Sequence, residues 1–218
     1  MLNLIVVLVL SYLMGSIPTS IIVAKLTKGI DIRKYGSGNA GGTNSFRVLG
    51  WKAGLFVSLF DIGKGTFATL VISKIRFEAL PFESSSAIMV LAGVAAILGH
   101  TYTIFAGFKG GKGVGTGAGM LLGLFPIAFI ICLAVFALFL FSSGIVSLSS
   151  IAAATSLPIV LFLFNRFTTM EVDAVLLGVS IIIPLFIIFT HRTNIQRLLK
   201  GEENVFENLK IFRKKKKQ

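Results

Sequence analysis

Long apolar runs, of the length needed to cross a membrane, dominate this sequence. Four of them cover residues 2–24, 52–75, 86–108 and 174–190, and a fifth extends from residue 115 to residue 164. A helix needs roughly 20 mostly apolar residues to cross about 30 Å of hydrocarbon. Only 14% of the residues are charged, against about 25% in a typical soluble domain. We therefore predict an all-α, polytopic helical bundle that lies in a membrane.

The basic residues predict on which side of the membrane each loop lies. The formal net charge is +12, and Lys and Arg gather in residues 25–52, around Lys109 and Lys112, and beyond residue 190. Because cytoplasmic loops are enriched in Lys and Arg, we place these three segments and the C-terminus in the cytoplasm and the N-terminus outside. A nucleic-acid-binding protein would share the basic pI but not the mean hydropathy of +0.89, so we expect no nucleic acid partner.

The long run from residue 115 to residue 164 predicts the number of spans. It begins on the cytoplasmic side and leads to an outside turn, so it crosses the membrane an odd number of times. It is too long for one crossing, and three crossings need about 17 residues each. We place the breaks near Pro126, where proline ends a helix, and at residues 142–150. The prediction is about seven spans, two of them short, and five spans with a re-entrant region is the alternative.

We expect residues 1–203 to form one membrane domain and residues 204–218 a basic cytoplasmic tail. The tail ends in a run of lysines, and juxtamembrane lysines attract anionic lipid, so anionic membrane lipid is an expected partner. The single cysteine, Cys132, permits no internal disulfide. His, Cys and carboxylate residues show no metal-ligand spacing, and we expect neither a metal nor a cofactor.

A first candidate anion site lies in residues 35–50, which read YGSGNAGGTNSFRVLG. The backbone amides of such a glycine-rich loop can form a concave nest for an anion. A helix that begins near Thr43 or Asn44 would direct its positive N-terminus at the same anion. Arg47, one turn later, can form two hydrogen bonds with a phosphate. A flexible linker is the alternative, and we favour a phosphate site.

A second candidate anion site lies in residues 105–119, FAGFKGGKGVGTGAG. It is not a Walker loop, because Ala106 stands where that motif requires glycine and Gly113 follows the lysine. The alternative reading is that Lys109 and Lys112 extend to the membrane surface while small residues pack helices together. Since that reading leaves many glycines around the lysines unexplained, we favour an anion site.

Two further polar groups are predicted on the cytoplasmic side. Residues 147–150, Ser-Leu-Ser-Ser, most simply hydrogen-bond to their own helix. His191 and Asn194 are three residues apart on one helical face and can contact a phosphate or a hydroxyl. For the segment that carries them, a basic helix lying on acidic lipid is the alternative.

Ionisable residues also occur inside the predicted spans. Asp61 and Lys64 are three residues apart and can pair on one face of a helix, which offsets part of the free-energy cost of charge in a bilayer. We interpret this pair as structural support. His100 is isolated in the sequence, and we interpret it as a structural histidine near the membrane surface.

Together these motifs resemble the bacterial membrane glycerol-3-phosphate acyltransferases that use acyl-phosphate as the acyl donor. The resemblance covers residues 2–203. Its residues are 15–18, Gly36, Ser37, Gly38, Asn39, Gly41, Thr43, Asn44, Arg47, Leu49, Gly50, Asp61, Lys64, Gly65, Gly99, His100, 107–114, the Ser-Leu-Ser-Ser patch, His191, Arg192, Asn194, Ile195, Gly201 and Glu202. The sequence departs from the family pattern at Ala40, Gly42 and Gly115, where the family usually has proline, alanine and alanine.

The resemblance implies transfer of a fatty acyl group from acyl-phosphate to the 1-position of sn-glycerol 3-phosphate. The products are lysophosphatidate and phosphate, in the first step of phospholipid synthesis. It places the active site on the cytoplasmic face of the bacterial inner membrane and implies the upstream acyl-phosphate-forming enzyme as a partner. The alternative is a transporter for a small phosphorylated anion. Transporters bind their substrates near mid-membrane between repeats, whereas this sequence shows no repeat and all its polar motifs are predicted on one face.

The resemblance also implies which residues form the site. The catalytic residues are Ser37, Arg47, Lys112, His191 and Asn194. The substrate-binding residues are Gly36, Gly38, Asn39, Ala40, Gly41, Thr43, Asn44, Lys109, Gly110, Gly111 and Ser149. In this reading the backbone amides of residues 37–41 hold the acyl-phosphate, and the cationic residues with Ser149 hold the phosphate of glycerol 3-phosphate. The general base stays open between His191 and a phosphate oxygen of the substrate, and we favour the latter.

Overall fold

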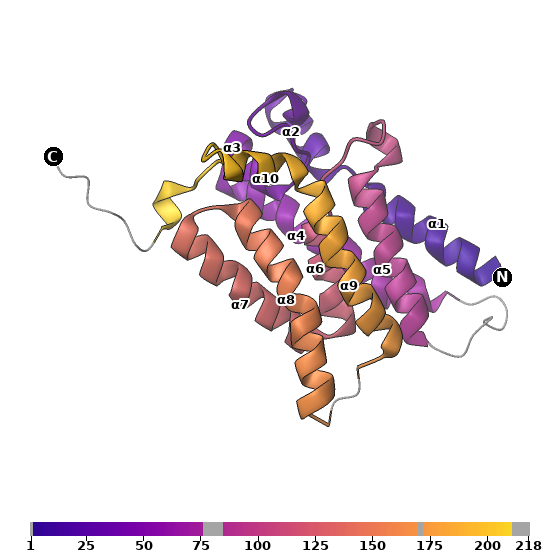
Figure 1. Ribbon diagram of the computed structural model, residues 1–218. Helices are drawn as coiled ribbons and strands as arrows, with labels where there is room; N and C mark the ends of the chain where they lie inside the picture. Colours follow the sequence, from indigo (N-terminus) through magenta and orange to yellow (C-terminus); the bar gives the residue numbers. More distant parts are fainter. Residues whose placement is uncertain (1, 76–84, 170–171, 211–218) are drawn as a thin grey trace. The chain divides into compact units, whose positions relative to one another are not determined.

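The computed structural model describes residues 2–75, 85–169 and 172–210 (Figure 1). Over these residues every regular element is a helix, so the predicted all-α class is confirmed. The chain divides into two compact units. The first comprises the described residues up to Pro126 together with Asp173–Leu176, and the second comprises Ile127–Val172 and the described residues from Leu177 onward.

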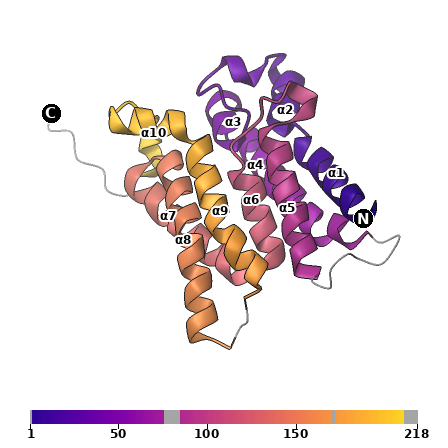
Figure 2. The same cartoon turned by 45° about the vertical axis from the view of Figure 1, so that its right-hand side comes forward.

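The first unit carries both glycine-rich motifs. Its helices are α1 (Leu2–Ser16), α2 (Thr19–Lys28), α3 (Gly42–Leu49), α4 (Trp51–Leu70), α5 (Ser85–Thr101) and α6 (Val114–Leu124), with short 3-10 turns η1 (Ile32–Lys34), η2 (Ile72–Lys74) and η3 (Ile104–Ala106). In Figures 1 and 2, α1 lies along α5 and α4 lies along α6. The predicted first span is broken at Pro18, which separates α1 from α2.

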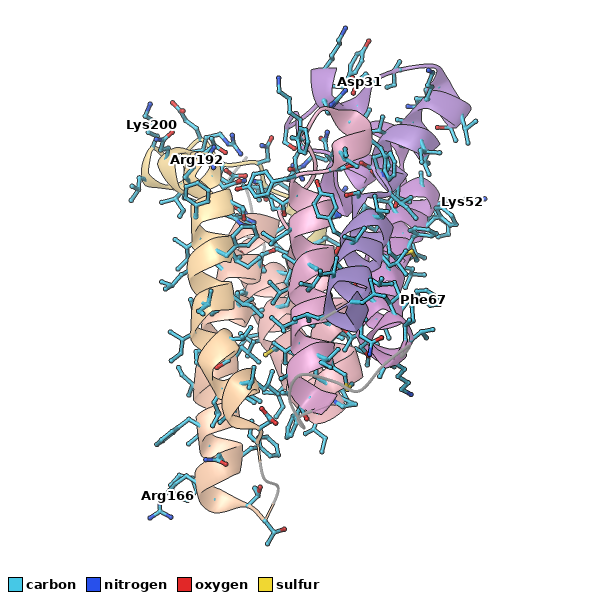
Figure 3. All side chains as sticks on the ribbon, turned by 90° about the vertical axis from the view of Figure 1, so that its right-hand side faces the viewer. Asp31, Lys52, Phe67, Arg166, Arg192 and Lys200 are labelled. Atoms are coloured by element: carbon cyan, nitrogen blue, oxygen red, sulfur yellow. The ribbon has the colours of Figure 1, made fainter. Side chains whose placement is uncertain are left out.

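The second unit carries the serine patch and the His191 segment. Its helices are α7 (Pro126–Ser143), α8 (Val146–Phe167), α9 (Ala174–Thr190) and α10 (Arg192–Leu199), followed by the 3-10 turn η4 (Glu207–Leu209). The first residues of α7 and of α9 belong to the first unit. Figure 3 shows Arg166 at one end of this unit, and Arg192 and Lys200 at the other. The two ends are thus separated by the length of α9, and the placement of the end with Arg192 and Lys200 in the cytoplasm stays a prediction.

Both predicted breaks in the long apolar run are confirmed. Pro126 is the first residue of α7, a position where its missing N–H costs no helical hydrogen bond. Gly144, with φ +73°, ends the same helix, as a left-handed glycine commonly does. The resulting α6 has 11 residues and is therefore only about 16 Å long, roughly half of the hydrocarbon thickness.

The lengths of the described helices indicate five or six membrane spans. Over the described residues five helical segments are long and apolar enough to cross a membrane. A sixth is added if α9 and α10, which are bent by 63° at their junction, count together. The helix α6 is apolar but shorter than this limit. Seven spans, two of them short, stay a prediction, and α6 would be one of the short ones.

Glycines allow the helices of the first unit to approach backbone to backbone. A Cβ atom on Gly119 of α6 would lie 1.9 Å from the Ile62 carbonyl oxygen of α4, and one on Gly99 of α5 would lie 2.1 Å from the Tyr12 carbonyl oxygen of α1. Small residues mediate this kind of contact between membrane helices. The second glycine-rich motif therefore has two parts: its last glycines pack α6 on α4, and its first ones form a loop.

The described part of the predicted tail, residues 204–210, belongs to the second unit. The backbone N–H of Phe206 donates to the Gly144 carbonyl oxygen at 2.8 Å, and a Cβ atom on Gly144 would lie 2.9 Å from the Phe206 carbonyl oxygen. Residues 204–210 thus contact the turn between α7 and α8. The run of lysines at the end of the tail lies outside the described residues.

Candidate active site

Asn44 organises the first glycine-rich loop. Its side-chain amide donates to the carbonyl oxygens of Ile32 at 3.2 Å and Tyr35 at 2.9 Å, and its Oδ1 accepts from the Ser37 N–H at 2.9 Å. Asn44 is fully buried, and a Cβ atom on Gly36 would lie 2.3 Å from its Oδ1. The side chain predicted as a substrate ligand is therefore engaged in holding the loop in its shape.

These contacts correct the predicted cradle of backbone amides at two positions. The Ser37 N–H is bound to Asn44, and the Gly38 N–H donates to the Tyr35 carbonyl oxygen at 3.1 Å. Neither amide points to an anion in this geometry. The Ser37 hydroxyl and the amides from Asn39 onward stay candidates for contact with a phosphate.

The helix α3 follows this loop, close to the predicted start. It begins at Gly42, and its first N–H groups have no partner within the helix, which makes this end favourable for an anion. Thr43 and Arg47 are four residues apart and lie on the same face of α3. Arg47 is half-buried. A Cβ atom on Gly42 would lie 2.1 Å from the Ser58 hydroxyl of α4, so the N-terminus of α3 is seated directly on α4.

The second glycine-rich loop folds back onto the end of α5. The N–H groups of Gly110 and Gly111 donate to the carbonyl oxygens of Thr101 and His100, each at 3.0 Å. A Cβ atom on Gly111 would lie 3.0 Å from the Ala40 carbonyl oxygen of the first loop. The two glycine-rich loops therefore meet at Gly111.

The two lysines of this loop differ in exposure. Lys109 is exposed, whereas Lys112 is half-buried, next to the buried glycines Gly111 and Gly113. A partly desolvated ammonium group interacts more strongly with an anion than an exposed one. This difference favours Lys112 over Lys109 as the phosphate ligand, a choice that the sequence left open.

Arg33 links the two loop segments by hydrogen bonds, a role that the sequence interpretation did not predict. The Arg33 Nη1 donates to the Ala106 carbonyl oxygen at 2.8 Å, and the other guanidinium nitrogens donate to the Asp31 carboxylate at 2.8–3.2 Å. These bonds from Arg33 lower the pKa of Asp31 from 3.8 to about 2, and the carboxylate raises the pKa of Arg33. Arginine in a loop with many basic residues carries no sequence signal for such a role.

The lowered pKa of Asp31 predicts a pH dependence of stability. A carboxyl group whose pKa is lower in the folded state stabilises the fold above its unfolded pKa, and that contribution is lost as the pH falls through the folded pKa. We expect Asp31→Asn to lower the melting temperature at pH 5–7. The difference from the wild type should shrink as the pH falls from 3.8 to about 2. Thermal unfolding in detergent over this pH range measures it, and an equal difference at every pH would contradict the assignment.

The residues predicted as structural support form a larger cluster than expected. The Asp61–Lys64 pair is confirmed, with 2.8 Å between Lys64 Nζ and Asp61 Oδ1. His100 is not isolated, as the sequence suggested, because its Nδ1 lies 3.5 Å from the same carboxylate oxygen. All three side chains are buried, and they come from α4 and α5.

In the second unit, the serine patch behaves as the simpler reading predicted. The Ser149 and Ser150 hydroxyls donate to the carbonyl oxygens four residues earlier, those of Ile145, just before α8, and Val146, both at 2.8 Å. The buried Ser147 hydroxyl has no hydrogen-bond partner among the residues that the structure describes. Ser149 is fully buried in this unit, and its hydroxyl oxygen can still accept a hydrogen bond.

His191 and Asn194 lie at the start of α10, and both are buried. The His191 Nδ1 lies 2.8 Å from the Ile187 carbonyl oxygen. Because a carbonyl oxygen only accepts, Nδ1 carries the proton in this bond, and in the neutral ring Nε2 is then an acceptor.

A glutamate that the sequence interpretation did not select holds Asn194. The Asn194 Nδ2 donates to Glu203 Oε1 at 3.0 Å, and Arg197 Nε donates to Glu203 Oε2 at 2.9 Å. The resemblance had pointed to the neighbouring Glu202, which is exposed. Gly201, with φ +72°, turns the chain back so that Glu203 faces α10. Only the geometry of this turn distinguishes the two carboxylates.

Comparison with known proteins finds relatives over most of this chain. A family profile described as glycerol-3-phosphate acyltransferase matches residues 5–201. The glycerol-3-phosphate acyltransferase of Chlorobium phaeobacteroides (strain BS1) is 48% identical over 228 residues, which cover 94% of this chain and 97% of that protein. The protein of the same name from Chlorobaculum tepidum is 46% identical, with the same coverage.

Solved structures give the same result at the level of the fold. The glycerol 3-phosphate form of PlsY (YgiH), an integral membrane glycerol 3-phosphate acyltransferase, is 37% identical, with a TM-score of 0.81 over 94% of this chain and 96% of that chain. The lysophosphatidic acid form of PlsY is 36% identical, with a TM-score of 0.80. These likenesses confirm a multi-pass membrane protein whose glycerol-3-phosphate acyltransferase relatives cover 94% of the chain. This chain therefore belongs to the glycerol-3-phosphate acyltransferase family.

Proposed function

We propose that this chain transfers a fatty acyl group from acyl-phosphate to the 1-position of sn-glycerol 3-phosphate. The products are lysophosphatidate and inorganic phosphate, and the reaction takes place on the cytoplasmic face of the bacterial cell membrane. The observation that carries this proposal is the meeting of two glycine-rich loops at Ala40 and Gly111, each beside one half-buried cation, Arg47 or Lys112. Two adjoining anion sites suit a reaction between two phosphorylated substrates.

The two loops take different substrates in this proposal. The Ser37 hydroxyl, the amides from Asn39 to Gly41 and the N-terminus of α3 receive the phosphate of the acyl donor. Arg47 and Lys112 bind the phosphate of glycerol 3-phosphate, with Lys109 nearer to solvent. A bidentate arginine supplies orientation as well as charge, so Arg47 aligns the acceptor.

In the second unit, we assign the glycerol end of the acceptor to His191 and Asn194, while Ser149 contributes to binding of its phosphate. Glu203 and the Ile187 carbonyl oxygen hold the first two side chains in place, and this leaves the imidazole Nε2 as the ring acceptor. The structure of PlsY with glycerol 3-phosphate supports this substrate for the family.

The chemical step requires positioning more than a protein nucleophile. The 1-hydroxyl oxygen of glycerol 3-phosphate attacks the acyl carbonyl carbon, the bond from that carbon to the phosphate oxygen breaks, and phosphate leaves. The hydroxyl proton goes to a phosphate oxygen of the substrate, and His191 is the alternative acceptor. Because a mixed anhydride has a good leaving group, alignment and charge neutralisation by Arg47 and Lys112 supply the catalysis.

One assay tests the proposed reaction against the alternatives. Purified protein in a lipid mesophase is given glycerol 3-phosphate with palmitoyl-phosphate, palmitoyl-CoA or palmitoyl acyl carrier protein. We expect equimolar phosphate and lysophosphatidate from palmitoyl-phosphate alone. Turnover with only one of the thioesters would contradict the donor. Uptake of glycerol 3-phosphate into proteoliposomes without any acylation would favour the transporter.

A further inference from the structure

We propose that Asp61, Lys64 and His100 are positioning residues. Through the contact of His100 with Gly111, they hold residues 110–112 in their phosphate-binding geometry. This inference rests on the proposed role of Lys112 as a ligand of the glycerol 3-phosphate phosphate. The three side chains act through the loop backbone and touch no reacting atom.

The first observation is how the His100 ring is held. Its Nδ1 faces Asp61 Oδ1 at 3.5 Å, and the same oxygen accepts from Lys64 Nζ at 2.8 Å and from the Thr19 hydroxyl at 3.4 Å. A carboxylate on one ring nitrogen sets the orientation of an imidazole and directs the other nitrogen away from it. The buried Asp61 carboxylate therefore determines where His100 Nε2 lies.

The second observation is what the ring supports. A Cβ atom on Gly111 would lie 2.0 Å from His100 Nε2 and 2.8 Å from its Cε1, so the imidazole is in direct contact with the Gly111 backbone. The His100 carbonyl oxygen accepts from the N–H of Gly111 at 3.0 Å. Both the side chain and the main chain of His100 thus contact Gly111, the residue that precedes Lys112.

The third observation is that the network also contacts the break between α1 and α2. Lys64 Nζ donates to the Ile17 carbonyl oxygen at 3.2 Å, in the interruption between α1 and α2. The Ser16 hydroxyl donates to the Gly99 carbonyl oxygen at 3.3 Å, and the Thr103 hydroxyl donates to the Ser16 carbonyl oxygen. These hydrogen bonds join the C-terminal ends of α1 and α5, next to the carbonyl groups of His100 and Thr101 that accept from the loop.

The burial of Asp61 and Lys64 indicates that this network orients the His100 ring as well as contributing to the stability of the fold. The side chain of Lys64 is 1% exposed and that of Asp61 is 6% exposed. A buried ion pair stabilises a fold little compared with apolar residues of similar volume, so stability alone gives weak reason to place charges here. The directional contacts of Asp61 and Lys64 with Ile17, Thr19 and His100 fix one orientation of the His100 ring against Gly111. Apolar packing would not fix this orientation.

The test measures glycerol 3-phosphate binding without any acyl donor, so its result does not depend on the proposed chemistry. Equilibrium binding of radiolabelled glycerol 3-phosphate is compared for the wild type, His100→Ala and the double variant Asp61→Leu/Lys64→Met. His100→Ala leaves the ion pair intact, and the double variant removes both charges together. Ile88→Ala, at a fully buried position at the other end of α5, is the matched control for loss of stability.

We expect the Kd for glycerol 3-phosphate to rise about tenfold or more in His100→Ala and in the double variant, because a small displacement of a binding group weakens its contact strongly. Their melting temperatures should be no lower than that of Ile88→Ala, whose Kd stays at the wild-type value. A wild-type Kd in either network variant would overturn the proposal. So would a Kd in Ile88→Ala raised as much as theirs.

Gly111→Ala provides a second route if a network variant does not fold. Its Cβ displaces the loop from the His100 ring while the ion pair stays in place, and the Kd should again rise about tenfold or more. A folded Gly111→Ala protein with the wild-type Kd would also overturn the proposal. Wild-type binding of glycerol 3-phosphate without turnover of palmitoyl-phosphate would instead contradict the proposed donor and leave this inference intact.

Discussion

Replacing Lys112 by methionine is expected to reduce kcat/KM for glycerol 3-phosphate by about 100-fold or more. The reason is that loss of one partner from a desolvated charge pair costs about 2–5 kcal/mol, and each 1.4 kcal/mol corresponds to a factor of ten. Methionine keeps most of the length and apolar volume of the side chain, so that the charge is the main difference. Steady-state kinetics with palmitoyl-phosphate and glycerol 3-phosphate measure the effect.

Two lysines serve as comparisons for this variant. Lys109→Met removes an exposed charge from the same loop and should cause a clearly smaller loss, since exposed ion pairs contribute about 0–1 kcal/mol. Lys52→Met removes an exposed lysine at the start of α4, whose ammonium group lies over the Trp51 ring, and should leave kcat/KM within a factor of two. If Lys109→Met were the more damaging variant, the assignment of Lys112 as the main phosphate ligand would be wrong.

The largest effect on stability is expected for Gly119→Ala, in α6. Its Cβ would lie 1.9 Å from the Ile62 carbonyl oxygen and 2.9 Å from the Thr66 backbone nitrogen. Both neighbours are backbone atoms of α4, so the strain cannot be relieved by turning a side chain, and α6 must move away from α4. Overpacking of this kind typically costs about 1–3 kcal/mol and occasionally more, and we expect the upper part of that range. Thermal unfolding in detergent, followed by far-ultraviolet circular dichroism, measures it.

Gly63→Ala is the matched control, because it makes the same substitution in the partner helix. A Cβ atom on Gly63 would meet nothing within 4 Å, and alanine has a higher helix propensity than glycine by about 1 kcal/mol. Gly63→Ala should therefore leave the melting temperature unchanged or raise it. If Gly119→Ala melted at the same temperature as Gly63→Ala, close contact between α4 and α6 would not be the reason for glycine at position 119.

Local sequence signals predicted much of the fold. Apolar length predicted a membrane bundle, because burial in hydrocarbon leaves little freedom in composition. The breaks at Pro126 and Gly144 were predictable because the rigid proline ring and the left-handed glycine act on their own helices. The pair of Asp61 and Lys64 followed from helical spacing alone.

The candidate site also contains residues that the sequence predicted and residues that only the structure identified. The sequence identified both glycine-rich loops, Arg47 and the two lysines, because a glycine-rich loop that carries a cation is a local pattern typical of anion binding. It missed Arg33 and Glu203, and it took His100 to be isolated. Each of these three acts on a residue from another segment, or across a turn whose direction no local pattern gives.

The sequence by itself determined the class of this protein, the helix breaks at Pro126 and Gly144, and the residue types of its candidate anion sites. These properties depend on hydropathy and on backbone chemistry within a few residues. Only the tertiary structure decided that Asn44 shapes the first loop, that Lys112 is less exposed than Lys109, and that a buried carboxylate of α4 orients a histidine of α5 beneath Gly111. Such contacts depend on helices meeting at a distance of a few ångströms, and the chain reaches that geometry only when the glycines of α1, α4, α5 and α6 are packed together.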